Sequence, residues 1–168
     1  DLFAIVNHWP SQGAPTEVRG SVAKKLREKL FELSKKNPKA SFIVTGDFNT
    51  LDSEYPNPFD ELQRDGLLID TRKYLDRNGL QGSYFYARQM TWNLLDRFFI
   101  SSDLDKKKVS FSILAPDFAT GLYEYTFKDS PYFGSRVVGI PKRFDHKKKN
   151  LKKMGYSDHF PVLLEIKD

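Results

Sequence analysis

The first fifty residues carry two hydrophobic patterns, which together predict a strand, a helix and a second strand. Phe3 and Ile5 indicate a buried strand that ends at residues 7–10, because Pro10 cannot donate to a β-ladder. Thr16 is a fair helix N-cap, and Asn37-Pro38 ends the helix. Between these ends, apolar side chains recur at helical spacing at Val18, Val22, Leu26, Leu30 and Leu33. Residues 41–45 are apolar, rich in β-formers and closed by Gly46, so we expect an α/β layer whose two strands can run parallel.

The rest of the chain is predicted to be rich in short strands. One short helix is expected at residues 58–64, followed by a polar stretch that reaches Gly82. The predicted strands, which suggest a mainly antiparallel sheet, are residues 83–86, 90–92, 95–100, 109–114 and 161–166. Residues 116–144 mix aromatic side chains with glycine and proline, so we expect a long irregular loop there. No repeat or linker divides the chain, and residues 1–168 are interpreted as one domain.

Composition and charge narrow the class of protein without indicating an activity. The 168 residues are 39% hydrophobic, which is enough for a real core, and no apolar run is long enough to cross a bilayer. We therefore expect a soluble protein. The absence of cysteine excludes disulfides and thiolate chemistry but leaves the compartment open. The net charge of +5 is concentrated in residues 142–153, which form either a solvated loop or a patch that faces phosphate.

Polar residues able to carry chemistry gather at the ends of four predicted strands. The clusters are Asn7 with His8, Asp47 with Asn49, Asp96 with Arg97, and Asp158 with His159. Strand ends on one rim of a sheet are where an α/β scaffold collects catalytic groups from distant sequence positions. Taken singly, each cluster also has a structural explanation, since Asp and Asn favour turns and an Asp beside an Arg is a common surface ion pair. Their joint occurrence favours a single site.

The residues around these clusters resemble the endonuclease/exonuclease/phosphatase superfamily. The matching segments are Asn7-His8-Trp9, Gly46-Asp47-Phe48-Asn49-Thr50, Leu95-Asp96-Arg97-Phe98-Phe99-Ile100-Ser101 and Tyr156-Ser157-Asp158-His159-Phe160-Pro161-Val162. They occur in the family's order and cover essentially the whole chain. The resemblance implies a four-layer α/β sandwich, in which two packed sheets of mixed or antiparallel strands are flanked by helices, with this chain as its C-terminal half. It also implies cleavage of phosphate esters at one rim.

The resemblance implies a role for each residue of the site. Asp47 would orient or deprotonate the attacking water, and Asn49 would hold that water and a phosphate oxygen. His159 would contact the scissile phosphate as a cation, with Asp96 fixing its tautomer and favouring its charged form. His8 would touch the phosphate or assist the leaving oxygen. The expected ligands of the divalent ion, which is Mg²⁺ or else Mn²⁺ or Ca²⁺, are Asp158, Asp47 and Asn49, since hard oxygen ligands suit such ions. Further substrate contacts are expected from Asn7, Trp92, Asn93 and Arg97.

One part of the family's pattern has no counterpart in this sequence. Family members carry on their first strands an Asn and a Glu that supplies the principal metal carboxylate, and a further acidic residue partners the first His. This chain begins at Asp1 within a predicted strand, so we expect a missing N-terminal part of the same domain to hold those groups. The 168 residues alone are then expected to bind metal poorly and to catalyse little or nothing.

The kind of phosphate ester stays open at this point. Stacking and charge for a nucleic-acid strand could come from Tyr84, Phe85, Tyr86, Trp92 and the basic run at residues 147–153, although aromatic residues in strands more often serve packing. The leading hypothesis is a nuclease-like phosphodiesterase acting on nucleic acid. The second is a lipid or inositol phosphate hydrolase, and the third is a non-catalytic relative that binds a phosphate ester or a partner. The oligomeric state is not predicted.

Overall fold

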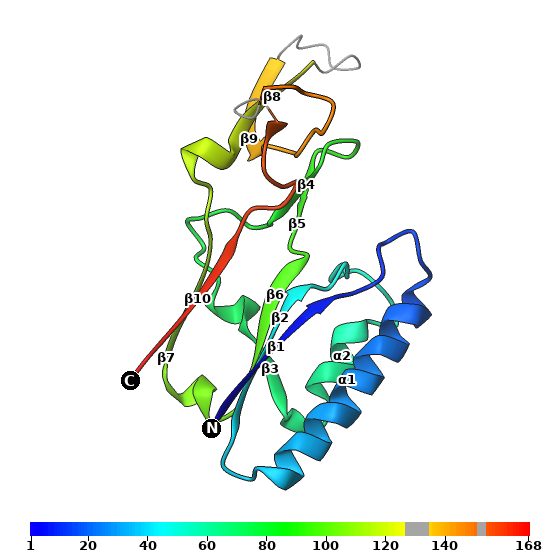
Figure 1. Cartoon of the computed structure of the whole chain (residues 1–168), viewed down its shortest axis with the longest axis vertical. Helices are drawn as coiled ribbons and strands as arrows, with labels where there is room; N and C mark the ends of the chain where they lie inside the picture. Colours follow the sequence, from blue (N-terminus) through cyan, green and yellow to red (C-terminus); the bar gives the residue numbers. More distant parts are fainter. Residues whose placement is uncertain (127–134, 151–153) are drawn as a thin grey trace.

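The main sheet of the molecule has four strands in the order β1-β2-β6-β3 (Figure 1). The computed structural model describes residues 1–126, 135–150 and 154–168. The four strands are β1 (Leu2–His8), β2 (Ser41–Asp47), β6 (Asp96–Ser101) and β3 (Leu68–Asp70). β1 and β2 run parallel, as predicted, and β6 is antiparallel to both β2 and β3. β3 falls inside the predicted polar stretch, where its three residues are too short a run to show a strand pattern.

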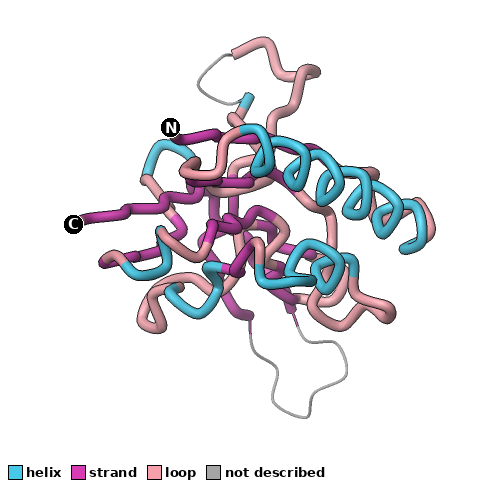
Figure 2. Tube along the Cα trace, turned by 90° about the horizontal axis from the view of Figure 1, so that it is seen from below, coloured by secondary structure: helices cyan, strands magenta, loops and turns pink. Residues whose placement is uncertain are grey.

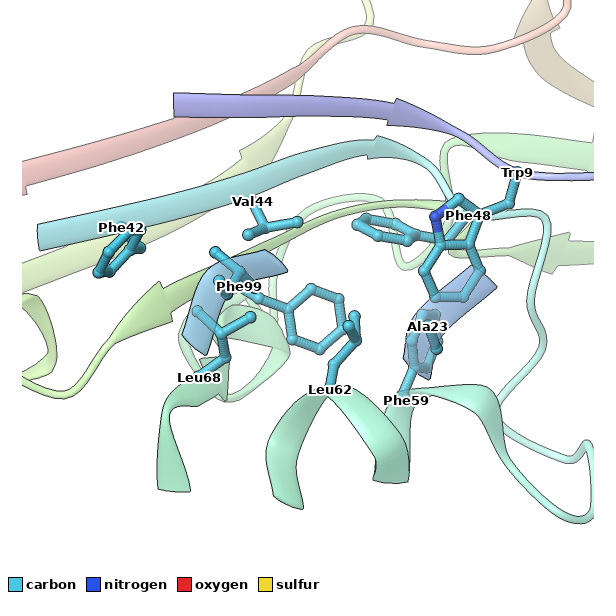
Figure 3. Close-up of a cluster of buried hydrophobic side chains, with 10 residues drawn as sticks. Trp9, Ala23, Phe42, Val44, Phe48, Phe59, Leu62, Leu68 and Phe99 are labelled. Atoms are coloured by element: carbon cyan, nitrogen blue, oxygen red, sulfur yellow. The ribbon is translucent and has the colours of Figure 1, made fainter. Parts of the chain in front are cut away.

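Two helices cover one face of this sheet, namely α1 (Thr16–Lys36) and α2 (Pro58–Gln63). The core between them is rich in aromatic rings, and Phe48 packs edge-on against both Trp9 and Phe99 at 4.9 and 5.3 Å (Figure 3). Helix α1 has the predicted extent, but Thr16 is not its N-cap. Pro15 holds the cap position, and the Thr16 hydroxyl donates to Glu54 Oε2 at 2.9 Å instead.

A second, two-stranded sheet packs on the opposite face of the main sheet. It pairs β7 (Lys108–Ile113) with β10 (Val162–Lys167) in antiparallel fashion. Phe99 of β6 points into the helical core, whereas its neighbour Phe98 meets Phe111 of β7 at 5.5 Å. Helices, main sheet and second sheet thus follow one another as layers, and the predicted α/β fold class is confirmed. Seen from below, both chain ends lie on the same side of the molecule (Figure 2).

Two hairpins complete the described structure beyond the two layered sheets. The first pairs β4 (Tyr84–Tyr86) with β5 (Thr91–Asn93), and the second pairs β8 (Thr120–Thr126) with β9 (Ser135–Pro141). The prediction of an irregular loop over residues 116–144 is therefore wrong for residues 120–126 and 135–141, and residues 127–134 lie outside the described part of the chain. The glycines in these strands do not interrupt a two-stranded hairpin, and the aromatic and β-branched content favours strands.

Short 3₁₀ helices connect the strands, namely η1 (Arg64–Gly66), η2 (Thr71–Tyr74), η3 (Leu104–Lys106) and η4 (Asp117–Ala119). Among the described residues, neither α-helix combines the length and hydrophobicity that a membrane span requires.

Candidate active site

The register of the main sheet brings three of the predicted residues to one rim. His8 pairs with Asp47 across β1 and β2, and Asp47 pairs with Asp96 across β2 and β6. Because β6 runs opposite to the other two strands, the last residues of β1 and β2 meet the first residue of β6. The three side chains line a cavity of roughly 640 Å³.

Glycine at position 46 permits the close approach of β1 and β2 beside Asp47. Its φ is +134°, and a Cβ on this residue would lie 1.9 Å from the carbonyl oxygen of Asn7. The Asn7 side chain also serves this contact, since Nδ2 donates to Ile5 O and Thr45 O at 3.3 Å. Asn7 is not among the residues that line the cavity, so the structure gives it a strand-joining position in place of the expected substrate contact.

Asp47 and Asn49 form a rigid turn after β2. Asp47 Oδ1 accepts the backbone N–H of Asn49 at 2.9 Å, and Oδ2 accepts Asn49 Nδ2 at 3.1 Å. Nδ2 also donates to Trp9 O at 3.1 Å, which leaves Asn49 Oδ1 without a donor among the described residues. Burial raises the pKa of the Asp47 carboxyl, the Asn49 N–H opposes this, and the charge of Asp96 adds to the increase. A raised pKa makes the Asp47 carboxylate a better base.

His159 meets Asp96 beside Asp47, and ligand atoms of the three residues lie within 4.8 Å of one another. His159 Nδ1 lies 2.6 Å from Asp96 Oδ2, and Ser83 Oγ donates to the same oxygen at 2.5 Å. Burial alone lowers the pKa of His159, but the hydrogen bond and charge of Asp96, with the charge of Asp47, raise the pKa overall above its usual value. The imidazolium form is thereby favoured, and it presents a cationic N–H donor to the cavity.

Strand β4 places His159, and its contribution was not predicted. Tyr84 forms an isolated β-bridge with His159, and Phe160 N donates to Ser83 O at 2.8 Å. The Tyr84 ring lies 5.0 Å from the His159 ring. Ser83 thus holds both the backbone beside His159 and the carboxylate of Asp96. The sequence carries no local signal for this role, because Ser83 meets its partners only through tertiary pairing.

His8 and Asp158 also line the cavity but stand apart from this cluster. The His8 side chain is 78% exposed, with Nε2 3.7 Å from Asp47 Oδ2, so little restrains its ring. The Asp158 carboxylate accepts a hydrogen bond from Arg143 Nη2 at 3.0 Å. Arg143 was not predicted as a site residue, although it belongs to the basic run.

Arg97, expected to contact substrate, instead lies in the core. It is 1% exposed, donates to Asp70 Oδ2 at 2.7 Å, and also pairs with Asp52. Its guanidinium lies 4.5 Å from the centre of the Phe59 ring. As Arg97 follows Asp96 in a strand, its side chain points to the opposite face, and this alternation is the physical reason for the correction.

Trp92 and Asn93, also expected to contact substrate, do not line the cavity. Trp92 packs against Phe85 and Phe160, and Asn93 pairs with Tyr84 in the first hairpin. In the basic run, residues 147–149 are exposed and line no described cavity, and residues 151–153 lie outside the described part of the chain. Of the predicted stacking residues, Tyr84 and Tyr86 do line the cavity.

The sequence profile of the endonuclease/exonuclease/phosphatase family matches residues 1–168. The chain belongs to this family. Its members are phosphoesterases, and the fold is shared with solved structures, whereas no curated protein sequence matches the chain.

Three of the similar structures show how much of the fold this family member covers. A mannosyl-6-phosphatase from Bacteroides thetaiotaomicron VPI-5482 is 20% identical, with a TM-score of 0.57 over 99% of this chain and 51% of that one. Truncated TDP2 from Caenorhabditis elegans is 16% identical, with a TM-score of 0.57 over 97% and 53%. A Staphylococcus aureus beta toxin variant with bound magnesium ions is 15% identical, with a TM-score of 0.58 over 98% and 52%. The chain therefore spans about half the length of these structures.

A divalent ion fits the donor set of this family member only in part. Ligand atoms of Asp47, Asp96 and His159 lie within 4.8 Å of one another, so the three could hold an ion. However, Asp96 Oδ2 is already bonded to Ser83 and His159, and an imidazolium repels a cation. Asp47 and Asn49 are the remaining oxygen donors at the centre. Mg²⁺ commonly takes one or two carboxylates and keeps several waters, so these residues fit a weak, largely hydrated site.

Proposed function

We propose that this chain carries catalytic groups of a metal-dependent phosphoesterase that hydrolyses phosphodiester bonds with an activated water. The observation that carries the proposal is the Asp96–His159 pair beside Asp47 in one cavity. The pKa values of Asp47 and His159 are both raised, which favours a base and a cation in the same space. A binding-only protein has no need of this combination.

The geometry supports a division of roles. Asp47 and Asn49 hold a water at the end of β2, and the Asp47 carboxylate accepts its proton as the oxygen attacks phosphorus. The His159 imidazolium, oriented by Asp96, donates to a phosphate oxygen as charge grows there. We assign to the exposed His8 ring a contact with a phosphate oxygen, because it lies 3.7 Å from Asp47 on the side of the attacking water, and the leaving oxygen departs on the opposite side. A bound Mg²⁺, held by Asp47 and Asn49, would supply Lewis-acid stabilisation of the phosphate.

The test is hydrolysis by the full-length protein with Mg²⁺, offered supercoiled plasmid DNA, abasic duplex DNA, sphingomyelin and inositol phosphates in parallel. We expect the DNA substrates to be cleaved. The variant His159→Gln should lower kcat by about 100-fold or more, because it removes a positioned charge that stabilises the transition state. His146→Gln is the matched control, because His146 is exposed and lines no described cavity.

Two outcomes would contradict this proposal. Cleavage of sphingomyelin or inositol phosphates alone would replace the nuclease-like activity with lipid or inositol phosphate hydrolysis. Full activity of His159→Gln would remove the proposed mechanism for any substrate.

A further inference from the structure

A second cavity, of roughly 250 Å³, adjoins the proposed active site. It lies beside β4 and the end of β9, and its lining includes Tyr84, Tyr86, Arg88, Pro141, Arg143 and Asp158. Three of these, Tyr84, Tyr86 and Asp158, also line the larger cavity. A ligand whose phosphate lies at the catalytic groups can therefore extend over the two tyrosines into the second cavity.

The lining of this second cavity joins apolar rings to positive charge. The half-buried rings of Tyr84 and Tyr86 offer flat apolar surface, of the kind on which a planar ring stacks, and the buried Pro141 packs beside them. Arg88 is exposed and has no polar partner among the described residues. A guanidinium is the side chain best suited to a phosphate, because its fork of N–H groups matches two phosphate oxygens.

Arg143 is fixed in place by the segment that leads to His159. Tyr156 N donates to Lys142 O at 2.8 Å, which ties the chain just after β9 to the segment before His159. Gly155 has a φ of +77°, and a Cβ there would lie 2.2 Å from Arg143 O. The guanidinium then reaches Asp158 at 3.0 Å. Arg143 is thus positioned by its backbone, although its side chain is 74% exposed.

We propose that this second cavity binds the nucleotide next to the scissile phosphodiester, with its ring on Tyr86 and its phosphate on Arg88 and Arg143. The inference rests on the proposed function. A choline headgroup is a cation, which Arg88 would repel because its charge, unlike that of Arg143, is not paired with a carboxylate in the described part of the chain, and a simple sugar phosphate has no second anion for the arginines. An inositol polyphosphate has the anions but lacks a planar ring to match the tyrosine surface.

The test compares two chromogenic substrates of the full-length protein with Mg²⁺. One is the p-nitrophenyl ester of thymidine 5′-phosphate, and the other carries an additional 3′-phosphate, so the scissile bond and leaving group are the same. We expect Arg88→Gln to raise KM about tenfold for the bisphosphate substrate, the size of one charged hydrogen bond, with little change for the other. The variant Arg143→Gln is expected to slow hydrolysis of both substrates, because it also removes the hydrogen bond to Asp158.

Arg64→Gln is the matched control, because Arg64 is exposed and, like Arg143, pairs with one carboxylate, that of Glu61 at 2.7 Å. This variant is expected to leave the KM for both substrates unchanged. If Arg88→Gln changed the KM equally for the two substrates, the proposed subsite would be overturned.

Binding separates the subsite from the proposed function. We expect thymidine 3′,5′-bisphosphate to bind the wild-type protein, by calorimetry, about tenfold more tightly than Arg88→Gln. If neither ester is hydrolysed but this difference persists, the proposed function fails and the subsite stands. If myo-inositol 1,4-bisphosphate binds as tightly as the nucleotide, the assignment to a nucleotide is overturned.

Discussion

At the scale of single residues, the site depends on how Asp96 shares its carboxylate. One oxygen, Oδ2, accepts Ser83 Oγ at 2.5 Å and meets His159 Nδ1 at 2.6 Å. The serine fixes the carboxylate, and the carboxylate fixes the imidazole and favours its charge. The protonation state of His159 is therefore controlled by Asp96 at the cavity wall and by Ser83 behind it.

We expect Asp96→Asn to lower the pKa of His159 in metal-free protein, because the charge that favours the imidazolium is removed. A folded-state pKa above the unfolded value stabilises the fold at low pH, and this stabilisation is lost as pH rises through the folded pKa. The variant should thus lose most stability at low pH, with the difference narrowing as pH rises. NMR titration of the imidazole measures the pKa of His159, and urea unfolding at several pH values measures the change in stability. An unchanged His159 titration would contradict the prediction.

The sequence identified most of the residues that meet in the cavity but not their supports. Asp47, Asn49, Asp96 and His159 stand in motifs near strand ends, and the hydrophobic pattern predicted those ends to within about two residues. Ser83 was not identified, because its partner is set by which strands pair, and no short segment of sequence contains that information.

At the scale of elements, Arg19 of α1 joins the two loops that flank the site. It is 2% exposed, and Nη1 donates to two carbonyl oxygens of the loop 11–14 at 3.1 Å each. Nη2 donates to Glu54 Oε2 at 2.6 Å, and Glu54 Oε1 accepts Leu51 N at 2.9 Å in the loop after Asn49. Three residues of the first loop line the cavity, so the helix holds one wall of the site in position.

Arg19→Met is expected to destabilise the fold by about 3 kcal/mol, because it leaves the Glu54 carboxylate without its partner. Burial alone raises the pKa of Glu54, but Arg19 and its other donors lower it overall, so this stabilisation is lost as pH falls through the folded pKa. Arg27→Met is the matched control on the same helix. Arg27 pairs with Glu61 at 2.9 Å but is more exposed, so we expect Arg27→Met to destabilise the fold by only about 1 kcal/mol.

Urea unfolding measures the stability of both variants. The KM of the full-length protein tests whether the wall of the cavity keeps its position. Arg19→Met is expected to raise KM, whereas Arg27→Met is not. Equal losses of stability and equal KM values would show that Arg19 has no special link to the site.

Helix α1 and the hairpin of β8 and β9 show which elements the sequence could predict. The helix has a regular apolar repeat and an Asn37-Pro38 stop, both of which are local. The hairpin has no clean alternation, and its strands are stabilised by pairing with each other, which a scan along the chain does not detect.

At the scale of the whole molecule, one face of the main sheet is only partly covered by the second sheet. Leu2 and Val6, on the edge strand β1, are 59% and 79% exposed. An apolar cavity of roughly 380 Å³ lies between the sheets, lined in part by Leu2, Phe98 and Leu164. Apolar surface of this extent on an edge strand favours association.

We expect the 168-residue chain, expressed by itself, to self-associate through this face. Val6→Lys should reduce the association, because a charge on an exposed edge strand opposes further pairing. Val18→Lys, at a 43% exposed position on α1, is the control. Sedimentation velocity over a range of concentrations measures the outcome, and equal behaviour of the two variants would exclude β1 as the associating surface.

The opposed direction of β6 has a consequence for how this scaffold can be altered. Asp47 is the last residue of β2, and Asp96 is the first residue of β6. The chain that connects them therefore lies beyond the rim of the sheet. Loop positions between them can be lengthened or exchanged as long as Asn49, Ser83 and strand β3 keep their places, whereas deletion of one residue within β2 would turn the carboxylate to the opposite side of the sheet. New specificities are therefore most readily grafted into the connections, and the strands themselves tolerate only substitutions.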